Sequence, residues 1–461
     1  MSRKSIFINF ATAVNFTAVK NTEMKFYNRD EELAQLVQIK EMAYTGHSKL
    51  TVLTGRRRVG KTSLIFRALE NEPFVYLFVG RKNETDLCQG YVDEIAGKLG
   101  IFVPQMDSFV EVFRFLMEQG VTRKFSLVID EFQEFLNINP SIYSDIQNYW
   151  DQYRTRTNIN FVVSGSIYSL MVKLFQDNKE PLFGRADNTM RIRPFTLDVL
   201  KEILTDYHPG YTNDDLLALY TFTGGVPKYV ELLADHKSLT IPKMIGQICR
   251  SDSPFLGEGR NLLIEEFGKK YGNYFSILSA ISSGINTQSE IEAHLGDKSI
   301  GGQLSKLETV YEVVSKQRPI FAKSGTQTVR YEIADNFLRF WFRYIERNRP
   351  LVEIGNYPAL EKIVTQDYTT YSGKTLELYF KQKMQERLEY RAIGSWWEPK
   401  GGNEIDIVAV CLDDVNAVAV EVKRQKKNFK PEQFALKVEH LKNKILPKYA
   451  IEAKCLSLED M

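Results

Sequence analysis

The stretch KLTVLTGRRRVGKTSLIFRALE, residues 49–70, decides the fold of this 461-residue chain. It begins with an apolar run of strand type and ends with apolar residues at helical spacing. Between them, Gly55 to Thr62 match the pattern G-x-x-x-x-G-K-[ST] at every specified position. A strand, a glycine-containing loop and a helix in this order are typical of a phosphate-binding loop, or P-loop. We therefore predict a P-loop at residues 55–62.

The residue types in this loop fit the binding of ATP together with Mg²⁺. Glycines let the backbone curl so that its amides surround the phosphates, and the N-terminus of the following helix adds a favourable dipole. Lys61 is predicted to neutralise the β- and γ-phosphates, and Thr62 to ligate Mg²⁺. The residues predicted to contact ATP here are Gly55, Arg56, Arg57, Arg58, Val59, Gly60, Lys61, Thr62 and Ser63. For the three arginines, we regard solvated surface charges as the simpler explanation.

An acidic pair, Asp130 and Glu131, ends a second apolar run, SLVID. An acid at such a strand end can hold Mg²⁺, directly or through water, and the next acid can polarise the attacking water. We predict these roles for Asp130 and Glu131 respectively. Two solvated acids at a strand end are the alternative.

The chain divides by pattern into several parts. Strand-type runs at 49–55, 73–79, 125–130, 159–165 and 189–195 alternate with helical patterns. Continuous apolar strands alternating with helices predict a parallel sheet covered on both faces, so residues 24–195 should form an α/β core. Residues 196–268 carry only helical spacing and predict a small helical domain.

Residues 269–349 predict three short helices and a two-stranded hairpin, which is the pattern of a winged helix, followed by an aromatic linker helix. Thr287 and Glu290 form a capping box at the start of the second helix, and Ser324-Gly325 marks the hairpin turn. Residues 350–461 predict a further α/β domain, with a helix near 371–390 and two alternating strands.

Composition limits the class of protein. The chain is 43% hydrophobic and 26% charged with a formal net charge of +2, so no strong global field indicates nucleic acid. The four cysteines lie far apart, which excludes a zinc knuckle and fits a reducing compartment. No apolar run approaches the roughly 20 residues of a membrane span, so no membrane partner is expected. Residues 1–23 resemble a signal peptide only loosely, and we expect an N-terminal extension of a cytoplasmic protein.

Four motifs make the sequence similar to the archaeal-type ATPases, a family related to the AAA+ and STAND ATPases. They are the opening Phe26–Leu33, the strand end Ser164–Ser166, the segment Leu182–Arg185, and Gly224–Pro227. The resemblance covers residues 24–345. It implies a P-loop NTPase fold with a parallel sheet of strand order 5-1-4-3-2 and a helical lid.

The resemblance also implies roles for individual residues. Arg29 belongs to the opening motif, which lies by the adenine, and Pro227 of the lid is expected close to the base. Either Ser164 or Ser166 would be the sensor that contacts the γ-phosphate or water. The sequence does not separate these two candidates, because both lie at the strand end. Arg185 would be a sensor or finger arginine, acting within its own chain or on a neighbour in a homo-oligomer.

The last hundred residues carry charges in two strand-type runs, EIDIVAV and AVAVEVK. Side chains alternate along a strand, so Glu421 and Lys423 share one face. Asp406 with this E-x-K is similar to the signature of restriction-endonuclease-like domains, in which two carboxylates bind Mg²⁺ and the lysine orients the attacking water. Glu377 matches an additional acid, and residues 350–461 resemble domain of unknown function 234, which often ends the archaeal-type ATPases.

The alternative for this tail is an exposed hairpin with ordinary surface charges. A local basic cluster beside it could neutralise DNA phosphates or simply be a charged helix start: Lys423, Arg424, Lys426, Lys427 and Lys430. We expect an ATPase whose nucleotide state is coupled to a DNA-directed winged helix and nuclease-like tail. The alternatives are a signalling switch whose inactive tail recruits partners, and a winged helix that binds protein.

Overall fold

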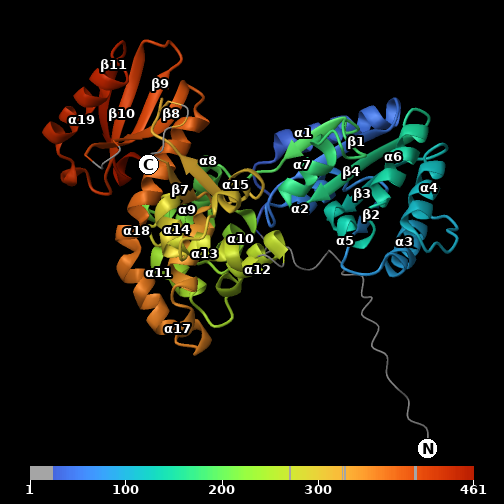
Figure 1. Cartoon of the computed structure of the whole chain (residues 1–461). Coiled ribbons are helices and arrows are strands. Elements are labelled where there is room, and N and C mark those ends of the chain that lie inside the picture. The colour runs from blue at the N-terminus through green and yellow to red at the C-terminus, as the bar shows by residue number, and fades with distance from the viewer. Residues whose placement is uncertain (1–23, 269–270, 324, 326–328, 399–401) are drawn as a thin grey trace, which may run out of the picture.

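The computed structural model describes residues 24–268, 271–323, 325, 329–398 and 402–461. The expected N-terminal extension, residues 1–23, lies outside these ranges. Figure 1 shows the elements from α1 to α7 gathered on one side of the molecule and those from α8 to the C-terminus on the other. None of the described helices is both long and apolar enough to cross a membrane.

The first part is built on a five-stranded parallel sheet with the order β2-β3-β4-β1-β5. This is the predicted order 5-1-4-3-2 read from the other edge, so the predicted fold class is confirmed. The strands are β1 (Lys49–Thr54), β2 (Phe74–Phe78), β3 (Lys124–Asp130), β4 (Asn158–Gly165) and β5 (Asn188–Arg191). β5 ends earlier than the strand-type run 189–195 predicted.

Helices cover both faces of this sheet, and successive residues of the central strands belong to different cores. Leu127 and Ile129 of β3 pack in one core with α3, α4, α6 and α7, whereas Val128 packs in another with α1 and α2. The continuous apolar strands of the sequence follow from this double burial. The helices are α1 (Asp30–Thr45), α2 (Lys61–Ala68), α3 (Glu84–Leu99), α4 (Phe109–Gln119), α5 (Phe135–Ile138), α6 (Ile142–Tyr153) and α7 (Tyr168–Gln176), with the 3-10 turn η1 (Phe132–Glu134).

The second part begins with helices only and continues with three helices and an antiparallel hairpin. The first group is α8 (Leu197–Tyr207), α9 (Asn213–Thr223), α10 (Pro227–Asp235), α11 (Ile241–Ile248) and α12 (Phe255–Phe267). The second group, arranged as in a winged helix, is α13 (Tyr271–Ser282), α14 (Gln288–His294), α15 (Gly301–Thr309), β6 (Val314–Gln317) and β7 (Arg330–Ile333). The expected capping box is present. The Thr287 hydroxyl accepts a hydrogen bond from the Glu290 amide at 3.4 Å, and the Glu290 carboxylate accepts one from the Thr287 amide at 3.2 Å.

The aromatic segment after the hairpin is helical, but its winding changes along its length. It forms α16 (Asn336–Phe340), the π-helical turn η3 (Trp341–Glu346) and α17 (Arg349–Glu353), and the 30-residue α18 (Tyr357–Glu386) follows. Large aromatic side chains of α16 and η3 are buried, which explains their density in the sequence: Phe337, Phe340, Trp341, Phe342 and Tyr344.

The tail is a small α/β domain with a four-stranded mixed sheet of order β11-β10-β9-β8. Its elements are β8 (Tyr390–Trp397), β9 (Glu404–Cys411), β10 (Asn416–Val422), α19 (Pro431–Lys444) and β11 (Ala450–Leu456). α18 packs on one face of this sheet and α19 on the other. One hydrophobic core runs from the lid helices through the winged-helix segment to α18, so these parts share buried surface along α18.

Candidate functional site

The P-loop lies between the end of β1 and the start of α2. Gly55 has φ 150°, and a Cβ there would meet the Ile192 carbonyl oxygen at 2.5 Å. Gly60 caps α2 with φ 88° in the left-handed region. A side chain at the first position would clash, and one at the second would be strained. The two glycines of the motif are thus required by the local backbone.

Lys61 folds back over the loop. Its Nζ donates to the carbonyl oxygens of Gly55 at 2.8 Å and Arg56 at 3.2 Å. Burial lowers the pKa of Lys61, and the nearby carboxylates of Glu131 and Asp130 oppose this shift. The ammonium group is therefore a desolvated cation beside the backbone amides that would surround phosphate.

Thr62 and Asp130 are in contact beside the P-loop, because the first turn of α2 lies next to the C-terminal end of β3. The Thr62 hydroxyl donates to Asp130 Oδ2 at 2.9 Å, and the Tyr76 hydroxyl donates to the same oxygen at 2.7 Å. Hydroxyl and carboxylate oxygens suit Mg²⁺, which usually takes few protein ligands and completes its shell with phosphate and water oxygens. The pair therefore fits a Mg²⁺ ion that arrives with ATP.

Glu131 is held in a strained and specific position. It adopts φ 54°, and its Oε2 accepts bonds from Ser166 Oγ at 2.7 Å and Gln133 Nε2 at 2.6 Å. Of the two candidate sensor serines, the structure brings Ser166 to Glu131. Ser164 is fully buried in β4, and its hydroxyl has no hydrogen-bond partner among the described residues.

A cavity of about 520 Å³ joins the loop, the two acids and the lid. Pro227 at the start of α10 lines its far wall, where the family resemblance placed the base. The predicted site residues on its wall are Arg57, Arg58, Gly60, Lys61, Thr62, Ser63, Asp130, Glu131 and Pro227. This volume lies within the range of small-molecule sites.

Two predicted arginines outside the loop do not line this cavity. Arg29 is buried behind the loop, where its Nη2 donates to the Arg193 carbonyl at 2.6 Å. Arg185 forms an ion pair with Asp151 at 3.0 Å and donates to the Phe183 carbonyl. The structure therefore does not bring Arg185 to the P-loop of its own chain.

Each of the three loop arginines is only partly exposed and pairs with a carboxylate, so the simpler explanation, plain solvated charges, is wrong. Arg58 pairs with the buried Glu258 at 2.8 Å. Arg57 pairs with Glu265, and Arg56 pairs with Asp335. Glu258 and Glu265 belong to α12, and Asp335 caps α16. The sequence gave no signal for this, because the partners lie about 200 residues or more away in the chain.

Glu266 of α12 is a further acid at the site. It lines a cavity of about 350 Å³ together with Glu131 and Ser166. Burial raises the pKa of Glu266 to about 7, while the positive charges of Arg56 and Lys61 oppose the shift. The three acids of α12, one in its first turn and two near its end, could have been noticed in the sequence, but nothing there places them at the P-loop.

The acids of the tail lie on adjacent elements. Asp406 of β9 and Glu421 of β10 stand on neighbouring antiparallel strands, and Asp406 Oδ2 accepts the Val422 amide at 2.7 Å. Burial raises the pKa of Asp406 to about 7, and the negative charges of Glu377 and Glu421 act in the same direction. The three predicted acids thus lie close enough to interact.

Lysines neutralise two of these acids. Glu421 pairs with Lys423 at 2.8 Å and with Lys437 at 3.4 Å. Glu377 pairs with Lys374 at 2.8 Å. Within the described ranges, no group of three or more His, Cys, Asp or Glu side chains is arranged to hold a metal ion. Lys374 and Lys437 were missed, because each lies on a helix well away from the strand signature.

Comparisons with known families divide the chain in the same way. A model of an ATPase domain predominantly from Archaea matches residues 26–233. A model of archaeal and bacterial proteins of unknown function matches residues 341–434. The uncharacterised protein MJECL04 of Methanocaldococcus jannaschii is 30% identical over 407 residues, which cover 86% of this chain and 87% of the relative.

Solved structures match this chain at lower identity. The Walker-type ATPase PABY2304 of Pyrococcus abyssi matches with a TM-score of 0.53 and 20% identity, over 69% of this chain and 96% of its own. The ORC2 protein of Aeropyrum pernix, solved with ADPNP and ADP, matches with a TM-score of 0.42 and 13% identity, over 73% of this chain and 97% of its own.

Proposed function

Because this chain belongs to the family of archaeal-type ATPases, we propose that it hydrolyses ATP at the P-loop and couples its nucleotide state to a DNA-directed tail. The ATPase assignment follows from the family, whereas the residue roles and the coupling are our proposal. ATP and Mg²⁺ are its proposed cofactors, and the cytoplasm, where ATP is available, is its proposed location.

Each residue at the cavity has a proposed task in hydrolysis. The loop amides and Lys61 would bind the phosphates, and Thr62 and Asp130 would hold Mg²⁺, whose charge offsets that of the phosphate oxygens. Glu131 accepts hydrogen bonds from the Ser166 hydroxyl and the Gln133 amide, so its carboxylate is positioned rather than free to rotate. An oriented carboxylate of this kind can align and polarise a water molecule for attack on the γ-phosphate.

One observation carries the proposed coupling: every arginine of the loop is paired with an acid outside the ATPase core. The acids are Glu258 and Glu265 of α12 and Asp335 of α16. Phosphate oxygens of ATP would compete with these carboxylates for the same guanidinium groups. ATP binding would therefore loosen α12 and α16, and α16 continues through η3 and α17 to α18, on which the tail sheet packs.

The experiment that tests this function compares wild-type protein with Lys61→Ala and Glu131→Gln. We expect steady ATP hydrolysis by the wild type, no hydrolysis by Lys61→Ala, and slow hydrolysis with intact ATP binding by Glu131→Gln. Unchanged turnover in Lys61→Ala would refute the site. Plasmid is added to the same samples with Mg²⁺ or Mn²⁺, with and without ATP, to measure DNA cleavage by the tail and its dependence on ATP.

Arg185 has a proposed role only between chains, since Asp151 holds it away from its own loop. A homo-oligomer could present it to a neighbour's γ-phosphate. Mixing Arg185→Ala with Lys61→Ala protein should then restore part of the hydrolysis, because each chain supplies what the other lacks. If Arg185→Ala alone hydrolyses ATP at the wild-type rate, Arg185 is only structural.

A second candidate function for the tail is binding without cleavage. Glu421 is paired with two lysines and Glu377 with one, so the acids are largely neutralised by the protein itself. Under this proposal, ATP switches a tail that recruits a partner. DNA cleavage that requires Asp406 would exclude this second candidate.

A further inference from the structure

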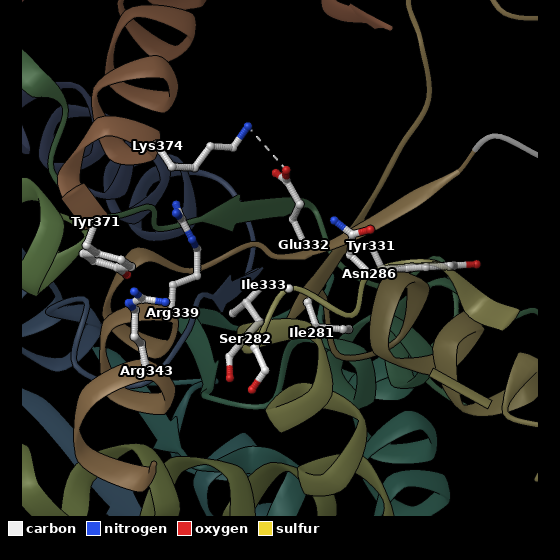
Figure 2. A pocket seen from close by; sticks show the side chains of 12 residues that line it. Ile281, Ser282, Asn286, Tyr331, Glu332, Ile333, Arg339, Arg343, Tyr371 and Lys374 are labelled. Atoms are coloured by element: carbon white, nitrogen blue, oxygen red, sulfur yellow. Dashed lines mark ion pairs between the residues drawn. The ribbon is translucent and has the colours of Figure 1, made fainter. Parts of the chain in front are cut away.

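A pocket of about 300 Å³ lies where the winged-helix segment meets α18. The end of α13 and strand β7 form one wall, and α16, η3 and α18 form the other. Figure 2 shows Arg339, Arg343 and Lys374 around it. None of the residues discussed for ATP hydrolysis lines this pocket.

The two arginines stand one helical turn apart and are bound differently. Arg343 donates from Nε and Nη2 to Asp367 at 2.9 and 2.7 Å. Arg339 donates to the amide oxygen of Asn336 at 3.3 Å, and no ion pair links it to a carboxylate among the described residues. Arg339 is therefore a cation whose charge the described part of the chain does not directly neutralise.

An aromatic side chain fixes the position of both guanidinium groups. The Arg339 and Arg343 guanidinium carbons lie 5.9 and 5.6 Å from the centre of the Tyr371 ring. Arg343 belongs to the π-helical turn η3, and such turns are rare and frequently lie at functional sites. Asp367 neutralises Arg343 only, so an anion bound beside Arg339 would offset the positive charge that remains in the pocket.

The charged side chains that line the pocket indicate which class of anion it would bind. Guanidinium groups present planar donor forks that match the oxygens of phosphate. Lys374 adds an ammonium group, although its ion pairs with Glu332 at 3.5 Å and Glu377 at 2.8 Å already occupy it in part. The hydroxyls of Ser282 and Ser283 donate to the Ser279 carbonyl, so the cations are the main donors.

A second cavity adjoins this pocket and contains the acids of the tail. Glu332 and Lys374 line both of them, and Glu377 and Asp406 line the second. A chain of phosphates with one group in the first pocket would therefore run toward the carboxylates of the tail. Successive phosphates of this kind belong to a nucleic-acid strand and not to an isolated small anion.

We infer that this pocket, centred on Arg339, binds a phosphate group, and that the phosphate belongs to a DNA strand directed toward Asp406. The phosphate chemistry rests on the pocket alone. The choice of DNA as its source rests on the proposed function of the tail.

The test uses the full chain, a short fluorescent single-stranded oligonucleotide with a 5′-phosphate, and the same oligonucleotide with a 5′-hydroxyl. EDTA is present, so neither cleavage nor ATP hydrolysis can affect the result. Arg339→Gln should weaken binding of the phosphorylated oligonucleotide about tenfold, the effect of losing a charge-assisted contact. Arg339→Lys keeps the positive charge and should lose less affinity for this oligonucleotide.

The matched control is Arg347→Gln. Arg347 is an exposed arginine that follows η3 and does not line the pocket, so this variant should bind as the wild type does.

Competition distinguishes the sources of the phosphate. Displacement by inorganic phosphate or deoxyribose 5-phosphate at low concentration would overturn the DNA assignment and leave a pocket for small phosphates. Equal binding by Arg339→Gln and wild type, or equal losses in Arg339→Gln and Arg347→Gln, would overturn the pocket itself. Melting temperatures measured without ligand ensure that a folding defect is not read as lost binding. If the phosphorylated oligonucleotide does not bind at this pocket, the proposed ATP hydrolysis and metal-dependent cleavage are not affected, because the binding test measures neither of them.

Discussion

Arg58, in the middle of the P-loop, forms a 2.8 Å ion pair with Glu258 of α12, whose carboxylate also accepts the Tyr229 hydroxyl at 2.8 Å. Arg58 adopts φ 68°, a left-handed conformation that costs a non-glycine residue on the order of 1 kcal/mol. A buried carboxylate and a strained backbone thus meet at one contact between the phosphate-binding loop and the second part of the molecule.

The first prediction concerns the stability of this contact. Arg58→Gln should lower the free energy of unfolding by about 1–3 kcal/mol, because it leaves the buried Glu258 without its cation. The double variant Arg58→Gln with Glu258→Gln should recover part of the loss. Urea denaturation of the two single variants and the double variant measures the coupling, and strictly additive losses would show that the pair is not an energetic unit.

The second prediction concerns competition between α12 and ATP. Glu265→Gln frees Arg57 for the phosphates, so ATP should bind about three- to tenfold more tightly. Glu202→Gln removes an exposed acid of α8 and should leave the affinity unchanged. Titration of fluorescent ATP into the protein gives both dissociation constants. Weaker binding in Glu265→Gln would mean that this acid helps ATP to bind rather than competing with it.

The third prediction separates the two serines at the end of β4. Ser166→Ala removes a hydrogen bond to Glu131, so kcat for ATP hydrolysis should fall about tenfold or more while ATP affinity changes little. Ser164→Ala removes a buried hydroxyl that has no partner among the described residues, and should not lower the melting temperature. If Ser164→Ala loses activity and Ser166→Ala does not, the sensor role belongs to Ser164.

Much of the fold could be predicted because its signals are local. The P-loop fixes a strand, a turn and a helix within 22 residues, and the buried strands are continuous apolar runs, so the parallel sheet follows, whereas its strand order came from the family resemblance. The structure differs at β5, which ends at Arg191. Just after it, the Ile192 amide donates to the Thr54 carbonyl at 2.8 Å, the Ile192 carbonyl lies close to Gly55, and the Arg193 carbonyl accepts a hydrogen bond from Arg29 Nη2.

The candidate sites were less predictable because their geometry depends on distant partners. From the sequence, the loop arginines were interpreted as surface charges. The structure shows that acids of α12 and α16 pack against them. Ser164 and Ser166 share the same strand end, and only the turn after β4 separates a buried hydroxyl from one that reaches Glu131. In the tail, strand alternation placed Glu421 and Lys423 on one face and the resemblance added Asp406, whereas Lys374 and Lys437 come from two helices on opposite faces of the sheet.

The fourth prediction is a pH dependence due to Glu266. Burial raises its pKa to about 7 from an ordinary value of 4.5, so the folded protein prefers the protonated form. Stability should therefore fall as pH rises from about 4.5 to about 7 and remain lower above that. Glu266→Gln imitates the protonated acid. Its advantage over wild type should be near zero at pH 4 and about 3 kcal/mol at pH 8, measured by urea denaturation. An advantage independent of pH would contradict the shifted pKa.

The fifth prediction concerns the tail. If it cleaves DNA, Asp406→Ala should eliminate cleavage of plasmid in Mg²⁺ or Mn²⁺ while ATP hydrolysis continues, because the P-loop and Asp406 lie in separate parts of the molecule. Glu439→Gln, a change on α19 outside the predicted acid set, is the control. Cleavage that persists in Asp406→Ala would point to a contaminating nuclease or to another site.

The central claim is that ATP binding releases α12 from the arginines of the P-loop. Hydrogen exchange of the Glu131→Gln protein, which should bind ATP without consuming it, tests this claim most directly. With Mg²⁺ and ATP, we predict slower exchange at residues 55–62 and faster exchange in α12, at residues 255–267. Slower exchange at the loop with unchanged or slower exchange in α12 would contradict the claim.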